Sequence, residues 1–497
     1  MSEFQIVIQS FLPVYTLLFG AVILLILDWT IGKKPVHKHI MPSISIITLI
    51  VAGYMVFIRP KDPSSFPGNP PLFYFGEFYA YFSLLAITAA FVIVLSAWKD
   101  MELELSLGVF YALLLIATAG ILIIAGAMNF IPLYVGFEVL SISTYAMIGF
   151  KKKSRAAAEA SIKYFLLGAL ASGILLFGIS LFYGATHSLQ LTSAVNVLNV
   201  IGTTKPNAYG LFVMALLVVG VGFKIAAVPF HVWVPDVYKG SSLSVTNFLA
   251  IGSKAGGFAF VFKIFLLSLI TIKSGWAPVW AVLAILTMIV GNLAALPQVS
   301  VTRILAYSSI AHVGYILIAL VSYAHGATEM ATIGALYHLM ANIFMKGTAF
   351  TVVLIVVYQT GGDTLEHFKG LSKRDPLTTF FMTIALLSLA GIPPFAGFFG
   401  KFFLFYSAVL SGDTYLAIIA IMMSAVSVFY YARIIYVMYF QEPSEANTET
   451  KTYPRFFILL FALTIGNIAL FFGALFLTPQ LVEFGSKVAQ ELAQFII

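Results

Sequence analysis

The sequence contains no cysteine, and only 9% of its 497 residues are charged. Without cysteine the chain has no disulfide, no thiolate nucleophile and none of the cysteine ligands that usually hold iron–sulfur clusters. It also lacks a glycine fingerprint for a dinucleotide and a P-loop. We therefore expect neither a cofactor nor a bound metal in this chain, and we assign any electron transfer to another polypeptide.

The scarcity of charge excludes an ordinary soluble domain, in which about 25% of residues are charged. Hydrophobic residues make up 61% of the chain, and its mean hydropathy is +1.00. Alternating ten-residue strands of a membrane barrel are not seen, so the fold class that remains is an all-α polytopic membrane protein. The net charge of +7 does not indicate nucleic acid, because the basic residues fall in short turns between apolar stretches.

Fourteen apolar stretches have about the 20 residues that a bilayer requires. The predicted spans are 4–29, 40–58, 73–97, 104–126, 128–149, 161–184, 208–230, 244–270, 277–296, 304–323, 328–359, 376–411, 414–440 and 455–477. The tail, 478–497, carries Glu483, Lys487 and Glu491 among apolar residues. This pattern predicts an amphipathic helix at the interface or on a partner, with a frayed end as the alternative.

The basic residues of the connectors alternate strongly between the two sides of the membrane. Fifteen fall on one side: Lys33, Lys34, Lys38, Lys99, Lys151, Lys152, Lys153, Arg155, Lys239, Arg303, Lys369, Lys373, Arg374, Lys451 and Arg455. Five fall on the other: Arg59, Lys61, Lys205, Lys273 and Lys487. Because basic loops stay in the cytoplasm, both termini are predicted outside. The N-terminus has no basic segment before its first apolar span, so we expect that span to remain as a membrane helix.

Seven further cations lie in or at the edge of predicted spans. A cation at mid-bilayer costs at least ~2.5 kcal/mol, so it normally faces water or a counter-charge. Lys163, Lys263 and Arg433 lie near span ends, where the side chain can reach the interface. Four lie closer to span centres and are candidate functional groups: Lys224, Lys254, Lys346 and Lys401.

Only one acid, Glu138, lies near the centre of a span. A carboxylate beside a lysine in a low-dielectric path forms a couple in which the protonation of each group depends on the other. The alternative is a static ion pair that fixes helix packing.

Two spans are interrupted by proline. Pro229 follows Lys224 in the seventh span, and Pro393 and Pro394 precede Lys401 in the twelfth. Such breaks survive in a membrane where protein or water satisfies the freed backbone, and paired broken helices are typical of repeat-built transporters. The two broken spans are five spans apart in the chain. Because five is an odd number, corresponding spans would cross the membrane in opposite directions, which predicts two inverted five-helix repeats. We divide the chain into the first three helices (1–103), the first repeat (104–270), the second repeat (277–440) and helix 14 with the tail (455–497).

Polar groups lie between these lysines. His312 is central in the tenth span, and His338, Asn342 and Lys346 are four residues apart and share a helix face. Histidine suits a proton relay because its ordinary pKa is near ~6.5, although a lone histidine can equally be a packing residue. His231 lies near the cytoplasmic exit beside Asp236, as a gate or as a capped loop residue.

The segment PFHVWVPDVYKGSSLSVTNFLAIGSKAGGF resembles the signature of the antiporter-like subunits of complex I, which are similar to Mrp-type cation/proton antiporters. Three further segments resemble subunit N of the NADH-quinone oxidoreductase family: YVGFEVLSISTYAMIGF, ILAYSSIAHVGYILIAL and GIPPFAGFFGKFFLF. The segment ALYHLMANIFMKGTAF differs from typical subunit N and is more similar to the other antiporter-like subunits and to Mrp proteins. It leaves the exact paralogue open, and a divergent complex fed by reduced deazaflavin or ferredoxin remains an alternative to NADH.

This resemblance implies a proton path in which Glu138 pairs with Lys224, Lys254 and His312 form the central relay, and Lys401 serves the outward half. It implies a non-redox subunit of a proton-pumping quinone oxidoreductase in a prokaryotic plasma membrane. Its partners would be other membrane-arm subunits and lipids, with quinone, flavin and iron–sulfur clusters in those partner subunits. An Mrp-like sodium/proton antiporter subunit is the second hypothesis, and a structural scaffold with static buried charges is the third.

Overall fold

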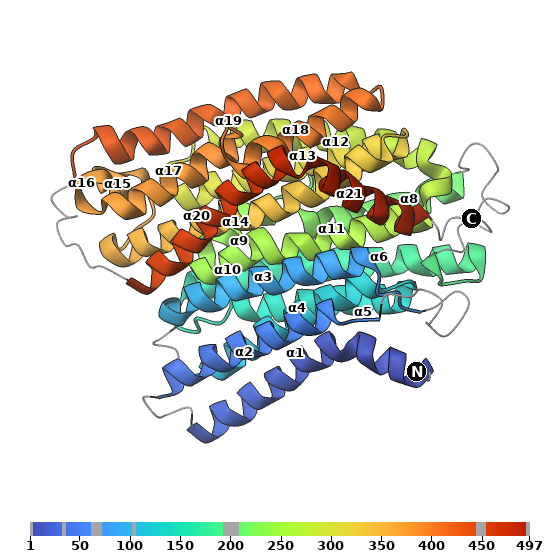
Figure 1. Ribbon diagram of the computed structural model, residues 1–497, viewed down its shortest axis with the longest axis horizontal. Helices are drawn as coiled ribbons and strands as arrows, with labels where there is room; N and C mark the ends of the chain where they lie inside the picture. Colours follow the sequence, from blue (N-terminus) through green and yellow to red (C-terminus); the bar gives the residue numbers. More distant parts are fainter. Residues whose placement is uncertain are drawn as a thin grey trace. The chain divides into compact units, whose positions relative to one another are not determined.

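The computed structural model describes residues 3–31, 36–60, 72–101, 106–191, 208–443 and 454–493. Within these ranges the regular elements are helices, and thirteen of them are long and apolar enough to cross a membrane (Figure 1). Two shorter apolar helices, α17 (Pro376–Ala390) and α18 (Ala396–Leu410), together occupy the predicted twelfth span. The polytopic all-helical architecture is confirmed.

The chain divides into two compact units. Unit 1 comprises Met1–Ile225, Gly252–Ala277 and Lys487–Ile497, and unit 2 comprises Ala226–Ile251 and Pro278–Ser486. The helices that begin in unit 1 are α1 (Glu3–Ile31), α2 (His37–Phe57), α3 (Glu77–Asp100), α4 (Leu107–Gly126), α5 (Phe130–Ile148), α6 (Arg155–Thr186), α8 (Ala208–Ile225), α11 (Lys254–Phe262), the π-helix η4 (Lys263–Ser268), the short 3₁₀ turn η5 (Ile270–Ile272) and α12 (Lys273–Ala295). Those that begin in unit 2 are α9 (Trp233–Gly240), α10 (Leu243–Phe248), the π-helix η3 (Leu249–Ser253), α13 (Val301–Ala324), α14 (Thr328–Thr360), α15 (Leu365–Phe368), α16 (Leu371–Arg374), α17, α18, α19 (Thr414–Phe440), α20 (Pro454–Phe476) and α21 (Thr478–Ala493).

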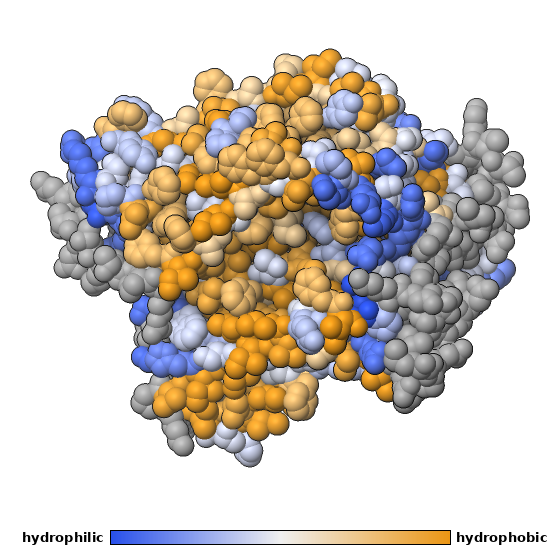
Figure 2. Space-filling view, viewed as in Figure 1, coloured by the Kyte–Doolittle hydropathy of each residue, from blue (hydrophilic) through white to orange (hydrophobic). Residues whose placement is uncertain are grey.

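Each unit is built around a central buried helix. In unit 1, α11 packs against α3, α4, α5 and α8, and α4 and α5 approach closely at Gly120 and Gly136. A Cβ on either glycine would lie 2.8 Å from the carbonyl oxygen of the other, so a larger residue would force the two helices apart. In unit 2, α14 packs against α13, α17, α18 and α20. Apolar side chains cover most of the helical surface on the face drawn in Figure 2, as expected for helices that face lipid.

Both predicted helix breaks are present and have similar backbone geometry. After α8, Ala226 adopts a positive φ of 65° and the Val228–Pro229 bond is cis. After α17, Gly391 adopts a φ of 87° and the Pro393–Pro394 bond is cis. The cis proline follows the positive-φ residue by three positions in each case. The inverted-repeat arrangement itself stays a prediction.

The predicted eighth span, 244–270, is not a uniform α-helix. A π-helical segment, η3, ends just before Lys254, and a second one, η4, begins at Lys263. The π-helix is a wider turn that occurs in short pieces, frequently at functional sites. Two intramembrane lysines therefore lie at junctions between α- and π-helical geometry.

Within each unit, an ion pair joins a connector predicted on the cytoplasmic side to another element. In unit 1, Lys151 pairs with Asp100 at 2.8 Å, which joins the α5–α6 turn to the end of α3. In unit 2, Asp363 binds Lys239 and accepts a hydrogen bond from Ser300 at 2.7 Å. Five connector lysines lie outside the described residues: Lys33, Lys34, Lys61, Lys205 and Lys451.

The tail forms α21, so the predicted amphipathic helix is confirmed from Thr478 to Ala493 and the frayed-end alternative is wrong for these residues. Residues 494–497 lie outside the described part.

Candidate functional site

In unit 1 the side chain of Lys224 is buried among hydroxyl groups and aromatic rings. It lies in the last turn of α8 and is 2% exposed. Its Nζ donates to Ser141 Oγ on α5 at 3.0 Å and to Tyr164 OH on α6 at 3.5 Å, and it lies 5.5 Å from the centroid of the Phe137 ring. Neutral groups therefore hold this cation.

The acid expected to pair with Lys224 lies nearby but does not bind it directly. Glu138 accepts a hydrogen bond from Ser172 Oγ, which in turn lies 2.9 Å from Tyr134 OH. Its charge acts on Lys224 through space. Ser141, one helical turn after Glu138, supplies the direct contact to the lysine. The two members of the predicted Glu138/Lys224 pair thus bond to different serines, and Glu138 is half-buried instead of fully buried.

Lys254 is 5% exposed and is the first residue of α11. Gly257 follows it by one turn and lies against the seventh span. A Cβ at Gly257 would lie 3.0 Å from Ile225 Cγ2 and 3.5 Å from Lys224 Cγ. Because residues i and i+3 share a helix face, this close approach brings Lys254 and Lys224 to the same region of unit 1.

In unit 2 the two predicted histidines meet. His312 Nδ1 and His338 Nε2 are 2.9 Å apart, and their rings are stacked with centroids 5.1 Å apart. Which nitrogen donates depends on the tautomers. On the same face of α14, Asn342 donates to the His338 carbonyl at 2.9 Å, and Lys346 Nζ donates to Ser309 Oγ at 3.2 Å.

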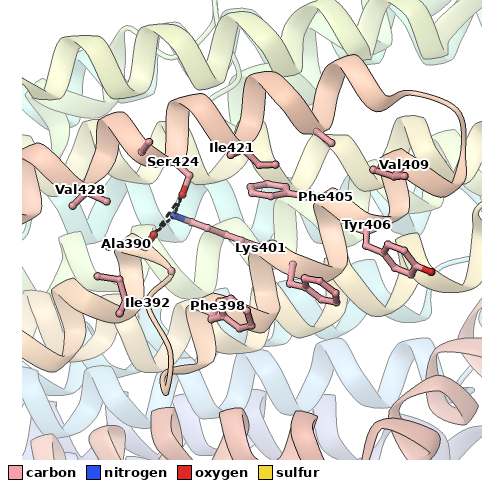
Figure 3. A pocket seen from close by; sticks show the side chains of 14 residues that line it. Ala390, Ile392, Phe398, Lys401, Phe405, Tyr406, Val409, Ile421, Ser424 and Val428 are labelled. Atoms are coloured by element: carbon pink, nitrogen blue, oxygen red, sulfur yellow. Dashed lines mark hydrogen bonds between the residues drawn. The ribbon is translucent and has the colours of Figure 1, made fainter.

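Lys401 lies at the second helix break (Figure 3). Its Nζ donates to the carbonyl of Ala390, the last residue of α17, at 2.8 Å and to Ser424 Oγ on α19 at 2.7 Å. The ammonium also lies 5.2 Å from the centroid of the Tyr315 ring, and that ring meets His312 edge-on at 5.6 Å. Unit 2 therefore brings Lys401, the histidine pair and Lys346 into one polar region.

A cavity of about 510 Å³ opens beside Lys401. Most of its walls are apolar, and the side chains labelled in Figure 3 include Phe398, Phe405, Tyr406, Ile421 and Val428.

His231 does not join this polar region. Burial lowers the pKa of His231, and its Nδ1 has no hydrogen-bond partner within the described residues. The expected neighbour, Asp236, instead pairs with Arg303 at 2.9 Å.

The sequence predicted a surface-reaching side chain at Lys263, and this prediction is wrong. Lys263 is 2% exposed, whereas Lys163 is exposed and pairs with Glu159 at 2.7 Å. The serine hydroxyls that hold the lysines were not predicted from the sequence. For Ser141, its position one turn after Glu138 is a signal that could have pointed to its role.

Comparison with known proteins identifies the family. Residues 127–428 match the family described as NADH:quinone oxidoreductase/Mrp antiporter, TM. The chain belongs to this family. The matched region contains the seventh and twelfth spans, both helix breaks, the intramembrane lysines and the three histidines of this subsection.

Two relatives of the NADH:quinone oxidoreductase/Mrp antiporter family cover most of the chain. F(420)H(2) dehydrogenase subunit N of Methanosarcina mazei is 39% identical over 424 residues, which are 84% of this chain and 84% of the relative. NADH-quinone oxidoreductase subunit N of Desulforamulus reducens is 40% identical over 371 residues, which are 74% of this chain and 76% of the relative. The predicted resemblance to subunit N is confirmed.

Solved structures of the family have the same fold. A chain of respiratory complex I from Thermus thermophilus has a TM-score of 0.76 and 30% identity, with 94% of this chain and 99% of that chain covered. A chain of the archaeal membrane-bound sulfane sulfur reductase has a TM-score of 0.85 and 26% identity, with 98% and 99% covered. A chain of the Mrp complex from Dietzia has a TM-score of 0.81 at 19% identity, with 98% and 97% covered, and supports the fold alone.

Proposed function

We propose that this chain is a proton-translocating membrane-arm subunit of a complex I type dehydrogenase, and that it works beside other antiporter-like subunits without a redox centre of its own. The relatives named above are subunits of dehydrogenase and quinone oxidoreductase complexes. The buried lysines of the chain supply the groups that such a role requires.

The observation that carries the proposal is the manner in which Lys224 is held. A buried ammonium paired with a carboxylate is costly to neutralise, because removing its charge leaves the acid uncompensated. Lys224 instead donates to Ser141 at 3.0 Å, with Glu138 acting from a greater distance. A hydroxyl can donate as well as accept, so the site can accommodate the amine in either protonation state.

In the proposed mechanism, quinone chemistry in partner subunits perturbs the Glu138/Lys224 pair. Lys224 releases its proton to Lys254. Transfer within unit 1 is supported by Gly257, which lies one turn after Lys254 and approaches the Lys224 side chain. The charge change then favours release through Lys401, with His312 and His338 as the relay in unit 2. Moving one charge through 100 mV requires ~2.3 kcal/mol, which the redox partners must supply.

Quinone, flavin and iron–sulfur clusters belong to the partner subunits in this proposal, and the electron donor is NADH, reduced deazaflavin or ferredoxin. We further propose a prokaryotic plasma membrane as the location, with both termini outside. Proteins that copurify with the chain in mild detergent test this assignment. Flavin and iron–sulfur subunits support a dehydrogenase, whereas an assembly without redox subunits favours the Mrp-like antiporter.

The substitution Lys254→Met tests conduction against a scaffold role. Methionine keeps the apolar stem without the titratable amine, so it leaves no large cavity. We expect a normal yield of complex, slower coupled quinone reduction and a large loss of proton uptake per electron in reconstituted vesicles.

Lys163→Met is the matched control, because Lys163 is exposed and pairs with Glu159, an exposed acid on the same helix. Full pumping by an assembled Lys254→Met complex refutes the central relay. Loss of assembly in that variant alone supports the scaffold.

A further inference from the structure

The C-terminal helix places an acid at the outer end of unit 1. Glu491 of α21 is 9% exposed, and its carboxylate accepts hydrogen bonds from the backbone of Glu77 at 2.6 Å and of Phe78 at 3.2 Å. These two residues begin α3, where free N–H groups and the helix dipole favour an anion. The preceding residue, Gly76, makes no side-chain cap, and a Cβ there would lie 2.5 Å from Glu491 Cδ. The N-terminus of α3 is therefore shaped to receive this carboxylate.

The other acid at this end already has a cation of its own. Arg59 is 6% exposed and pairs with the Glu77 carboxylate at 3.2 Å. It also donates to the carbonyls of Phe75 at 2.9 Å and Gly76 at 3.1 Å, which fixes the chain just before α3. Arg59 thus neutralises Glu77, and Glu491 is available to another charge.

That charge is Lys263, the intramembrane cation at the start of η4. Its Nζ lies 4.9 Å from the centroid of the Phe78 ring and 3.5 Å from Met128 Sδ. A ring face and a thioether are weak partners for a buried ammonium. Phe78 contacts both groups, since its amide binds Glu491 and its ring faces Lys263, and the two charges act on each other.

We propose that Lys263 and Glu491 form a charge pair at the outer end of the proton path in unit 1, in which the C-terminal helix supplies the carboxylate. The state of this pair sets how readily Lys254 takes up a proton. This inference rests on the proposed proton-conducting function, because it assigns Glu491 a positioning role in that process.

The link to Lys254 follows from the helix. Lys254 and Lys263 lie nine residues apart, which corresponds to about 13 Å along an α-helix. Charges at this separation interact appreciably where no water screens them. A change of charge at Lys263 therefore alters the balance between the charged and neutral forms of Lys254.

Few other charges face the pair. Burial raises the pKa of Glu491, and the Lys263 charge and the two α3 amides oppose this rise. Glu77 and Arg59 compensate each other, and Lys487 lies one turn earlier on α21. Of the remaining helices around α11, α4 carries no charged residue, while α5 and α8 carry Glu138 and Lys224.

The test compares Glu491→Gln with the matched control Glu483→Gln on the same tail helix, each in the whole complex reconstituted in vesicles. Proton uptake per electron is measured across pH 6 to 9. We expect the alkaline limb of the Glu491→Gln profile to move to lower pH by about one unit, a tenfold change in proton activity, because Lys263 loses its counter-charge. Glu491→Asp should restore the profile, and Glu483→Gln should leave it unchanged.

The pair is tested independently by the double variant K263M/E491Q. If the two charges act as a pair, adding Glu491→Gln to Lys263→Met should cause no further shift in the profile. Coincident profiles for Glu491→Gln and Glu483→Gln overturn the inference while leaving the proposed function intact. If Glu491→Gln does not assemble, recovery of assembly in the double variant supports the pair, and no recovery overturns it. Absence of proton uptake by the unmodified complex refutes the proposed function itself.

Discussion

The substitution Gly391→Ala tests whether proton pumping depends on the position of the Lys401 side chain at the helix break. Gly391 ends α17 with a φ of 87°, and a Cβ there would lie 2.9 Å from Lys401 Cδ and 3.4 Å from its Nζ. An alanine in the left-handed region costs roughly 1–2 kcal/mol. It would also displace the lysine from the Ala390 carbonyl, and a hydrogen bond to a charged group is worth about 1.5–3 kcal/mol. The total destabilisation should be about 2.5–5 kcal/mol.

Gly412→Ala provides the matched control. Gly412 has a φ of 85°, and a Cβ there would meet no atom within 4 Å. This variant should show only the backbone strain of roughly 1–2 kcal/mol. Both complexes should assemble, because neither substitution removes a buried apolar side chain.

The decisive assay is proton uptake per electron in reconstituted vesicles, measured beside the thermal unfolding of each complex. Gly391→Ala should lose most of its pumping, whereas Gly412→Ala should retain it. Equal pumping by the two variants would mean that the close contact between Gly391 and Lys401 has no part in conduction.

Two further predictions concern polar contacts. Ser141→Ala removes the hydroxyl that accepts from Lys224 Nζ, an interaction worth about 1.5–3 kcal/mol. We expect pumping to fall about tenfold or more with normal assembly, and an unchanged rate would show that this hydrogen bond has no part in conduction. Burial alone would raise the pKa of Asp363, but its bonds to Lys239 and to a serine hold that pKa below its ordinary value. Its stabilisation is therefore present above the unfolded pKa of about 3.9 and is lost as pH falls through the native pKa. Lys239→Met should lower the free energy of unfolding at neutral pH by about 1 kcal/mol or less, because Lys239 is 46% exposed. The melting temperature should fall accordingly, and the difference from the unmodified complex should shrink below about pH 4. Lys369→Met, which removes only a surface pair, should show no such pH dependence.

The sequence predicts the breaks correctly because their cause is local. Proline has no amide hydrogen wherever it stands, so Pro229 and Pro394 interrupt a helix whatever surrounds them. The span lengths follow from the thickness of the bilayer, which is equally independent of tertiary contacts. Fourteen spans, including the divided twelfth, could therefore be found without a structure.

The prediction for Lys263 failed because the residues around its side chain come from distant parts of the sequence. Distance from the end of the span favoured a side chain that reaches water. Lys263 instead lies over the Phe78 ring at the start of α3, where Glu491 of α21 accepts a hydrogen bond from an amide 414 positions earlier in the chain. No helical periodicity in the eighth span encodes a contact of that separation.

The hydroxyl contacts were also beyond prediction from single spans. Serine is common in membrane helices, and its role depends on which neighbouring helix faces it. Ser141 accepts from Lys224 because α5 and α8 lie in the same unit, and Ser424 meets Lys401 because α18 packs on α19. The sequence indicated where the charges lie, whereas the structure identifies the groups that hold them.

Three of the four lysines predicted to conduct donate to a serine hydroxyl: Lys224 to Ser141, Lys346 to Ser309 and Lys401 to Ser424. Lys263, in contrast, contacts a thioether and an aromatic ring in the described part of the chain. A serine hydroxyl can accept from an ammonium and can rotate to donate to a neutral amine, so each site can lose its proton without breaking a salt bridge or repacking a helix. A carboxylate partner would instead favour the charged form and slow its discharge. The pairing of Lys263 with Glu491 therefore suits a group that sets the electrostatic potential of the path, whereas the serine-held lysines suit groups through which the proton passes.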